Sequence, residues 1–339
     1  MQPAPADMSV VICAYTEHRW NELRASVESV QKQNVEAAEI IVVVDHNPAL
    51  LERARVELPD VAVVENREPQ GLGGARNSGI AAARGSVIAF LDDDAVASPN
   101  WLAEFAKEYE DDEVLGVGGA IEPVWSDGQP RWFPDEFGWV VGCTYRGMPE
   151  SPARVRNLIG CNMSYRRRVF EVLGGFRLGY GCDETEFCIR VGRRWPGKAL
   201  LYVPAAKVYH QVPPGRARWA HFSSRCYFEG GSKAVVSWLL GAQEGLESER
   251  AYTLRTLPAG VLRGLSDAFL RHDPAGVARA GAIVAGLAIT TAGYARGKLS
   301  VVSAARRRGW HDGPGKPPFA GHPSEIHRQS HEHGDSPHA

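Results

Sequence analysis

The sequence lacks several features that would assign it to common classes of protein. Its six cysteines are scattered without a CxxC pair, which argues against a zinc site or a disulfide framework and suits a reducing cytoplasm. The net charge is only −2 over 339 residues, so charge does not favour nucleic-acid binding. The N-terminus, MQPAPADMSV, has no basic segment followed by an apolar one, and we therefore expect no signal peptide.

A long apolar run is also missing. The longest uncharged stretch, AGAIVAGLAITTAGYA, lies between Arg279 and Arg296, and it is shorter than the ~20 residues that a membrane-spanning helix needs. We interpret it as a buried helix of a soluble domain. Hydrophobic residues make up 44% of the chain, which is enough for a sizeable core.

The first hundred residues alternate between two kinds of segment. Apolar, β-branched runs predict strands at Met8–Tyr15, Glu39–Asp45 and Val61–Asn66, and a fourth in SVIAFLDDD. Helical patterns separate them, and one begins with Asn47 as N-cap and Pro48 at its first position. Because the strands are continuously apolar, the pattern predicts an α/β fold with a mostly parallel, Rossmann-like sheet covered by helices on both faces.

Three consecutive carboxylates, Asp92, Asp93 and Asp94, end the fourth predicted strand. Their mutual repulsion requires positive charge nearby. Asp92 and Asp94 could face the same side of a strand and hold Mg²⁺ or Mn²⁺ together with a phosphate ligand. The alternative is a solvated turn that caps the next helix. Asp45 also ends a strand, so it should face the same crevice as the aspartates.

The run QGLGGARNSG resembles a dinucleotide-binding fingerprint, with Asp92 about twenty residues further on. However, it follows the third strand instead of the first, and Arg76 stands where the third glycine belongs. The alternative is that the glycines let the backbone approach a ligand while Arg76 supplies charge to a diphosphate.

Two further features lie later in the chain. In GCDETEFCIR, the acids Asp183, Glu184 and Glu186 crowd the start of a predicted helix. They either interact favourably with the helix dipole or include a general base. His210 ends the last predicted strand, where it is either structural or a metal ligand.

Five stretches, in order, resemble the family 2 glycosyltransferases, which have the GT-A fold: SVVICAYTEHRW, EIIVVVD, GLGGARNSGIAAARGSVIAFLDDDA, NMSYRRRVFEVLGGF and CDETEFCIRVGRR. Three others, VVDHNP, RWFPDEFGWVVGCTYRGMP and ETEFCIR, resemble the glucosyl-dolichyl-phosphate glucuronosyltransferase-like branch. Two departures stand out: the usual Glu-Asp pair is reversed as Asp183-Glu184, and the usual Pro-Thr-Tyr-Asn is Cys13-Ala14-Tyr15-Thr16.

The resemblance implies a role for each matching position. Glu184 would be the catalytic base, with Asp183 as the alternative because the pair is reversed. Asp94 would hold Mn²⁺ or Mg²⁺ on the diphosphate, and His210 would be a further metal ligand. Asp45 would accept a hydrogen bond from uracil. The expected donor-binding residues are Tyr15, Glu17, Asp45, Gly73, Arg76, Asp92 and Asp93, and the candidate acceptor residues are Trp132, Arg146, Arg156 and Asn162.

These roles describe an inverting transferase that moves a sugar from a nucleotide donor, UDP by expectation, to a glycan or lipid-linked acceptor. The competing interpretations are an NAD-type oxidoreductase and a non-catalytic protein that binds nucleotide sugars. We expect a GT-A domain at 1–214, a helical segment at 215–305 and a disordered, His- and Pro-rich tail at 306–339. The protein should be cytoplasmic. Arginines beside apolar stretches in the helical segment suit peripheral attachment to the cytoplasmic face of a membrane, although ordinary solvated helix faces would look similar.

Overall fold

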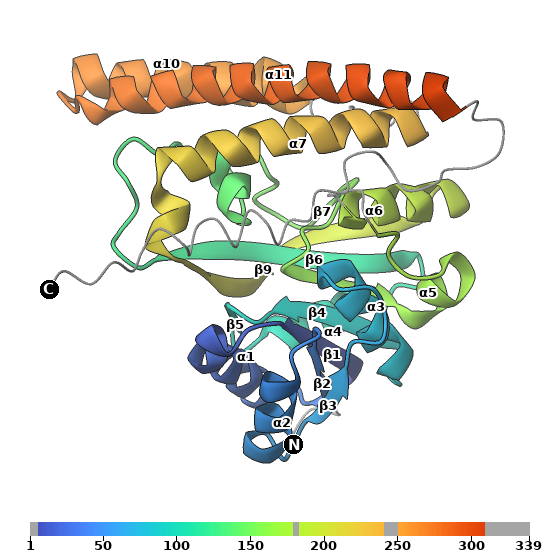
Figure 1. Cartoon of the computed structure of the whole chain (residues 1–339). Coiled ribbons are helices and arrows are strands. Elements are labelled where there is room, and N and C mark those ends of the chain that lie inside the picture. The colour runs from blue at the N-terminus through green and yellow to red at the C-terminus, as the bar shows by residue number, and fades with distance from the viewer. Residues whose placement is uncertain (1–5, 179–182, 241–249, 309–339) are drawn as a thin grey trace, which may run out of the picture. The chain divides into compact units, whose positions relative to one another are not determined.

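The computed structural model describes residues 6–178, 183–240 and 250–308 (Figure 1). From residue 309 on, the predicted disordered tail lies outside the described residues. The chain forms two compact units, which we call the sheet unit and the helical unit. The sheet unit comprises Met1–Val124, Val141–Arg177 and Glu184–Val212, and the helical unit comprises Trp125–Val140, Leu178–Asp183 and Pro213–Ala339.

A single sheet organises the sheet unit. Among the described residues it has nine strands in the order β3-β2-β1-β4-β8-β6-β9-β5, with β7 paired to β9. The strands are β1 (Ala6–Ala14), β2 (Ala37–Val44), β3 (Ala62–Glu65), β4 (Val87–Asp92), β5 (Ala95–Ala97), β6 (Val114–Trp125), β7 (Ala153–Arg154), β8 (Asn162–Arg166) and β9 (Ala199–Val212).

The direction of the strands changes across this sheet. The predicted strands form β1 to β4, and these pair in parallel. Beyond β4 the pairing is antiparallel, because β8 runs against both β4 and β6, and β9 runs against β5 and β7. The α/β class is confirmed, but the sheet is mixed, since only its N-terminal half is built from the strand–helix repeats that enforce parallel pairing.

Helices cover both faces of the sheet, as predicted. One face packs against a cluster that includes Ala75, Phe170 and Phe187, which come from three different helices. The opposite face carries two helices that also contact β1. The first group is α3 (Leu72–Ala82), α5 (Arg167–Leu173) and α6 (Asp183–Arg194); the second is α1 (Trp20–Gln31) and α4 (Trp101–Glu108); α2 (Pro48–Glu57) contacts β3 and is capped by Asn47 as predicted.

The helical unit is built on α7 (Trp219–Leu240), α10 (Leu257–Leu270) and α11 (Ala275–Arg308). Figure 1 shows α7 running along α11, with α10 beside α11. The segment around Phe133 and Phe137 contributes both rings to the interior of this unit, where each packs on Phe222 of α7. These aromatic side chains therefore serve packing.

The expectation of a buried helix between Arg279 and Arg296 was also wrong. Among the described residues, Ala275–Ser300 of α11 is long and apolar enough to cross a membrane, yet only 28% of its apolar window is buried. The uncharged stretch is therefore part of a longer helix with a largely exposed apolar surface.

Candidate functional site

The carboxyl ends of three parallel strands meet at one edge of the sheet. Cys13 of β1 lies opposite Asp92 of β4, and Ala14 lies opposite Val44 of β2. Tyr15, which follows β1, and Asp45, which follows β2, therefore lie beside the aspartates. The structure thus brings together residues that are far apart in the sequence, as the parallel arrangement predicted.

The positive charge that the three aspartates require comes from the protein itself. Arg19 lies 3.0 Å from both Asp93 Oδ1 and Asp94 Oδ2. His210 Nε2 lies 3.1 Å from Asp94 Oδ1. Arg76 Nη2 lies 3.4 Å from Asp92 Oδ1. The strand ends at Asp92 and the chain then turns, so Asp92 and Asp94 do not alternate along one strand as expected.

Asp93 is the most strongly perturbed member of the cluster. It is buried, and its Oδ2 has no hydrogen-bond partner among the described residues. Burial raises the pKa of Asp93 to about 7, and repulsion from Asp94 and Asp92 acts in the same direction, while Arg19 opposes both. The site therefore holds more negative charge than the neighbouring basic side chains compensate.

The donor set fits a divalent cation. Asp94 and His210 are buried and lie within 3.1 Å of each other. Ligand atoms of Asp92, Cys161 and His210 lie within 4.8 Å of one another. Asp93, whose Oδ2 has no hydrogen-bond partner among the described residues, follows Asp92 in the sequence. Carboxylate ligands suit Mn²⁺, and a neutral imidazole is a common metal ligand in proteins. Cys161 was missed by sequence reasoning because a lone cysteine carries no spacing signal.

A second polar cluster surrounds Asp45. Its Oδ2 accepts a hydrogen bond from the backbone N–H of Gly71, and its Oδ1 accepts one from Asn66 and lies 2.9 Å from His46 Nδ1. Gly71 has a φ of 128°, which favours glycine and lets its N–H turn toward the carboxylate. Asp45 therefore orders the loop before α3, and Tyr15, next to this cluster, is 41% exposed.

The glycine run serves packing more than ligand approach. A Cβ on Gly79 would lie 2.4 Å from Val11 Cγ1, and one on Gly74 would lie 2.0 Å from the Pro69 carbonyl oxygen. These glycines let α3 lie close to β1 and to the preceding loop. Gly73 is buried in the first turn of the same helix. Arg76 is buried as well, and it donates to the Gly160 carbonyl.

Glu184 lies next to Arg76. A Cβ on Gly160 would lie 2.9 Å from Glu184 Oε1 and 2.7 Å from Arg76 Nη2, so both side chains border the same small space. Glu186, by contrast, is buried and paired with Arg177 and Arg190. Its role is structural.

Asp183 begins α6, and it is only partly buried. Adjacent helical residues point about 100° apart, so Asp183 and Glu184 cannot present their carboxylates in the same direction. Glu17, which lies in the short helix after Tyr15, is exposed.

The candidate acceptor residues have different environments. Asn162 is fully buried, and its amide donates to the carbonyls of Ala120 and Ala206. Both of its donor hydrogens are used inside the sheet unit, so we leave it out of the acceptor site. Trp132 packs on Trp219 and Phe222 within the helical unit. Arg146 is exposed, and Arg156 is partly buried beside Asn157.

A mixed sheet covered by helices, with aspartates and a histidine gathered where its parallel strands end, is the arrangement expected of a glycosyltransferase of the GT-A class. Comparison with known proteins identifies the family. The sequence profile of glycosyl transferase family 2 matches residues 9–174. The glucosyl-dolichyl phosphate glucuronosyltransferase of Haloferax volcanii is 34% identical over 244 residues, which are 68% of this chain and 78% of that protein. The chain therefore belongs to glycosyl transferase family 2, and it is a hexosyltransferase.

Other similar proteins include the succinoglycan biosynthesis protein ExoM of Rhizobium meliloti, which is 27% identical over 235 residues, or 66% of this chain and 72% of that protein. A solved structure of the mannosyltransferase PcManGT from Pyrobaculum calidifontis, in complex with GDP-Man and Mn²⁺, covers 84% of this chain and 87% of its own at 17% identity, with a TM-score of 0.49. Family membership excludes the alternative of an NAD-type oxidoreductase.

Proposed function

We propose that this enzyme transfers a sugar from a UDP-linked donor to a hydroxyl of a lipid-linked sugar, with inversion at the anomeric carbon. The observation that carries the proposal is the convergence of Asp45, the aspartates with His210, and Glu184 beside Arg76 in the sheet unit. The name of the Haloferax relative supports a glucuronosyl donor and a glucosyl-dolichyl phosphate acceptor.

In this proposal, each part of the donor meets a different group. Tyr15 and Asp45 contact the uracil ring, and Asp92 contacts the ribose or the sugar. Asp94 and His210 hold a divalent cation, Mn²⁺ or Mg²⁺, which supplies positive charge to the diphosphate leaving group. Arg19 and Arg76 already bring positive charge to the aspartates, so they also favour a bound diphosphate.

Glu184 acts as the general base. Its carboxylate takes the proton from the acceptor hydroxyl while the hydroxyl oxygen forms a bond to the anomeric carbon. The bond from that carbon to the diphosphate oxygen breaks at the same time, and the electron pair leaves with UDP. Because attack and departure occur on opposite faces, the configuration inverts. A positioned base of this kind contributes about 10²–10⁴ in rate.

Arg156 is the residue that we propose to recognise a uronate carboxylate. It and Glu184 both lie near enough to Cys188 to influence the pKa of that thiol, although burial is the largest cause of its rise to about 11. Arg156 is therefore near the general base, where the transferred sugar would lie. A guanidinium pairs with a carboxylate through two parallel hydrogen bonds.

A screen of donors tests the proposal. Purified enzyme with Mn²⁺ is offered UDP-glucuronate, UDP-glucose and GDP-mannose, with a short-chain polyprenyl-phosphate glucose as acceptor. We expect transfer from a UDP sugar, and the loss of transfer in EDTA. Arg156→Gln should reduce the preference for glucuronate over glucose, whereas Arg154→Gln, whose guanidinium donates to the Gly197 carbonyl, should not. Transfer from GDP-mannose alone would contradict the assignment of UDP.

A lipid-linked acceptor also places the enzyme at the cytoplasmic face of a membrane in this proposal. The Haloferax relative is named for a dolichyl phosphate substrate, and the basic, apolar helical segment suits attachment to a lipid surface.

A further inference from the structure

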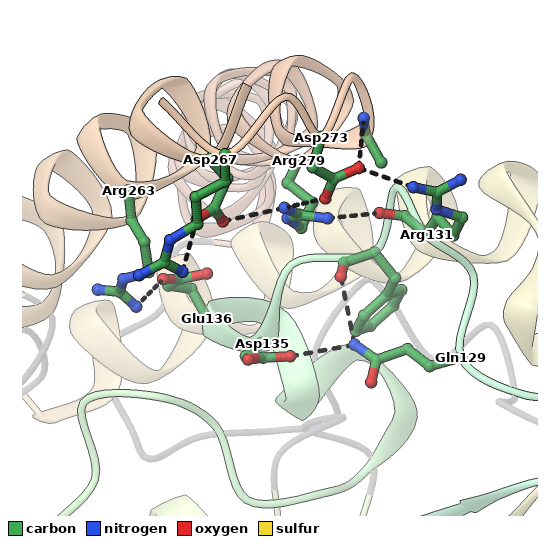
Figure 2. A network of polar contacts seen from close by, with 11 residues as sticks. Gln129, Arg131, Asp135, Glu136, Arg263, Asp267, Asp273 and Arg279 are labelled. Carbon is green, nitrogen blue, oxygen red and sulfur yellow. Dashed lines mark hydrogen bonds and ion pairs between the residues drawn. The ribbon is translucent and has the colours of Figure 1, made fainter. Parts of the chain in front are cut away.

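Ion pairs link α10 and α11 to each other and to the segment around Glu136 within the helical unit. Glu136 is buried and pairs with Arg263 of α10, and Arg279 of α11 pairs with Asp267 and Asp273 (Figure 2). Figure 2 shows these charged groups turned toward one another between α10, α11 and the segment that carries Gln129, Arg131 and Asp135. Glu136, Asp267 and Arg279 are at most 25% exposed in these pairs, whereas Arg131 and Arg271 are 76% and 78% exposed.

The outward faces of the same helices are apolar. On α10, Leu262 is 68% exposed, Phe269 is 72% exposed and Leu270 is 78% exposed. Leu262 and Phe269 are seven residues apart, which places them on one side of the helix. These are large apolar groups on a surface where a water-soluble helix normally carries charge.

The exposed face of α11 continues this pattern along most of its length. Exposed residues recur every three or four positions, as one face of a helix requires. None of these positions is charged, and the stripe is about 33 Å long at the usual helical rise. Its members are Val277, Gly281, Val284, Ala288, Thr291, Ala295 and Leu299.

The exposed charge within residues 250–300 has one sign. Within residues 250–300, all described, the only acids are Asp267 and Asp273, and both are paired with Arg279. The exposed ionised side chains are all basic: Arg250, Arg255, Arg271, Arg296 and Lys298. Apolar side chains that insert into a bilayer, together with cations beside them, are complementary to a membrane that contains anionic lipid.

We infer that the exposed faces of α10 and α11 form a membrane-docking surface that lies in the plane of an anionic bilayer. The inference rests on the proposed function in one respect: the lipid-linked acceptor is the reason that the enzyme needs a membrane. A spanning orientation of α11 is disfavoured because α7 packs along it. α7 carries an ion pair between Glu229 and Lys233, which a bilayer interior would not accommodate without cost.

Flotation with vesicles tests this surface on the full chain. Vesicles of phosphatidylcholine, with and without phosphatidylglycerol, are mixed with the parent enzyme and with the double variant Leu262→Glu, Phe269→Glu. We expect the parent to float with the anionic vesicles and the double variant to bind them at least about tenfold more weakly. The matched control is Val56→Glu on α2, because Val56 is equally exposed, at 74%, but lies in the sheet unit.

Three results would overturn the inference: a parent that does not float, a double variant that floats as well as Val56→Glu, or a parent dimer that the double variant converts to a monomer without any vesicle binding. The last result would assign the surface to a second copy of the chain. Hydrolysis of the donor without lipid is measured in parallel. An enzyme that hydrolyses donor but does not float contradicts the docking surface alone, and one that floats without transferring sugar contradicts the proposed function alone.

Discussion

Replacing Asp93 with asparagine should stabilise the protein at neutral and alkaline pH. The side chain is buried beside Asp92 and Asp94, and its pKa is raised from 3.8 to about 7. Asparagine has nearly the same shape as the protonated carboxyl and cannot ionise. Its oxygen can still accept the hydrogen bond that Arg19 donates to Asp93.

The direction of the effect follows from proton binding. Between pH 4 and pH 7 the folded protein keeps a proton on Asp93 that the unfolded chain has released, so the free energy of unfolding falls as the pH rises. Above pH 7 Asp93 is ionised in the folded protein as well, and the stability that its bound proton contributes is lost. The asparagine side chain of the variant has no such dependence. Over the two pH units from 5 to 7 the variant should gain about 2 kcal/mol relative to the parent, because Asp93 of the folded parent is only half ionised at pH 7. This gain corresponds to roughly 4–8 °C in Tm for a domain of this size.

Thermal unfolding of parent and variant at a series of pH values measures this difference. The two proteins share every other titratable group, so the difference between them reports on position 93. Asp60→Asn is the control, because Asp60 is exposed and its replacement should leave the pH dependence unchanged. A difference in Tm between Asp93→Asn and the parent that stays constant from pH 5 to pH 8 would refute the reasoning.

Three other substitutions test the site. Gly160→Ala should reduce transfer at least about tenfold with the fold retained, because its Cβ would displace Arg76 and Glu184. The control Gly192→Ala, with nothing within 4 Å of its Cβ, should not reduce transfer. Equal activity of the two variants would contradict the assignment. Arg19→Gln should lower the free energy of unfolding by about 3 kcal/mol, since it removes the partner of two buried carboxylates. Mn²⁺ should restore part of this loss in a thermal-shift assay. No response to Mn²⁺ would count against a metal at the aspartates. Asp94→Asn should reduce transfer to the level of the parent in EDTA without changing the circular dichroism spectrum, and full activity of this variant in EDTA would exclude Asp94 as a ligand.

Local sequence patterns predicted the first half of the sheet because its strands are apolar runs separated by helical patterns. One helix, α2, also has a start signal, since the Asn47 side chain caps it as expected. The antiparallel half was not predictable in the same way. β5 has three residues and β7 has two, and strands this short have no periodicity of their own. They are defined by pairing with β9, which is distant in the sequence.

The candidate site shows the same division. Strand ends predicted that Asp45 and Asp92 would be neighbours, but nothing in the sequence connects Arg19 with Asp93, because the contact depends on how the loop after β1 turns toward the end of β4. Cys161 is likewise placed by the turn before β8. The exposed apolar surface of α11 was misjudged because composition alone does not distinguish a buried apolar helix from one that faces outward.

The central claim, that Glu184 is the base of a sugar transfer, is tested most directly by measuring transfer rate and UDP affinity for Glu184→Gln and Asp183→Asn side by side. Removing a base affects the transition state and not the bound donor. We therefore predict that Glu184→Gln lowers the transfer rate by about 10²–10⁴ while UDP affinity stays within a few-fold of the parent, and that Asp183→Asn keeps most of its activity. An active Glu184→Gln together with an inactive Asp183→Asn would contradict the account and reverse the two roles.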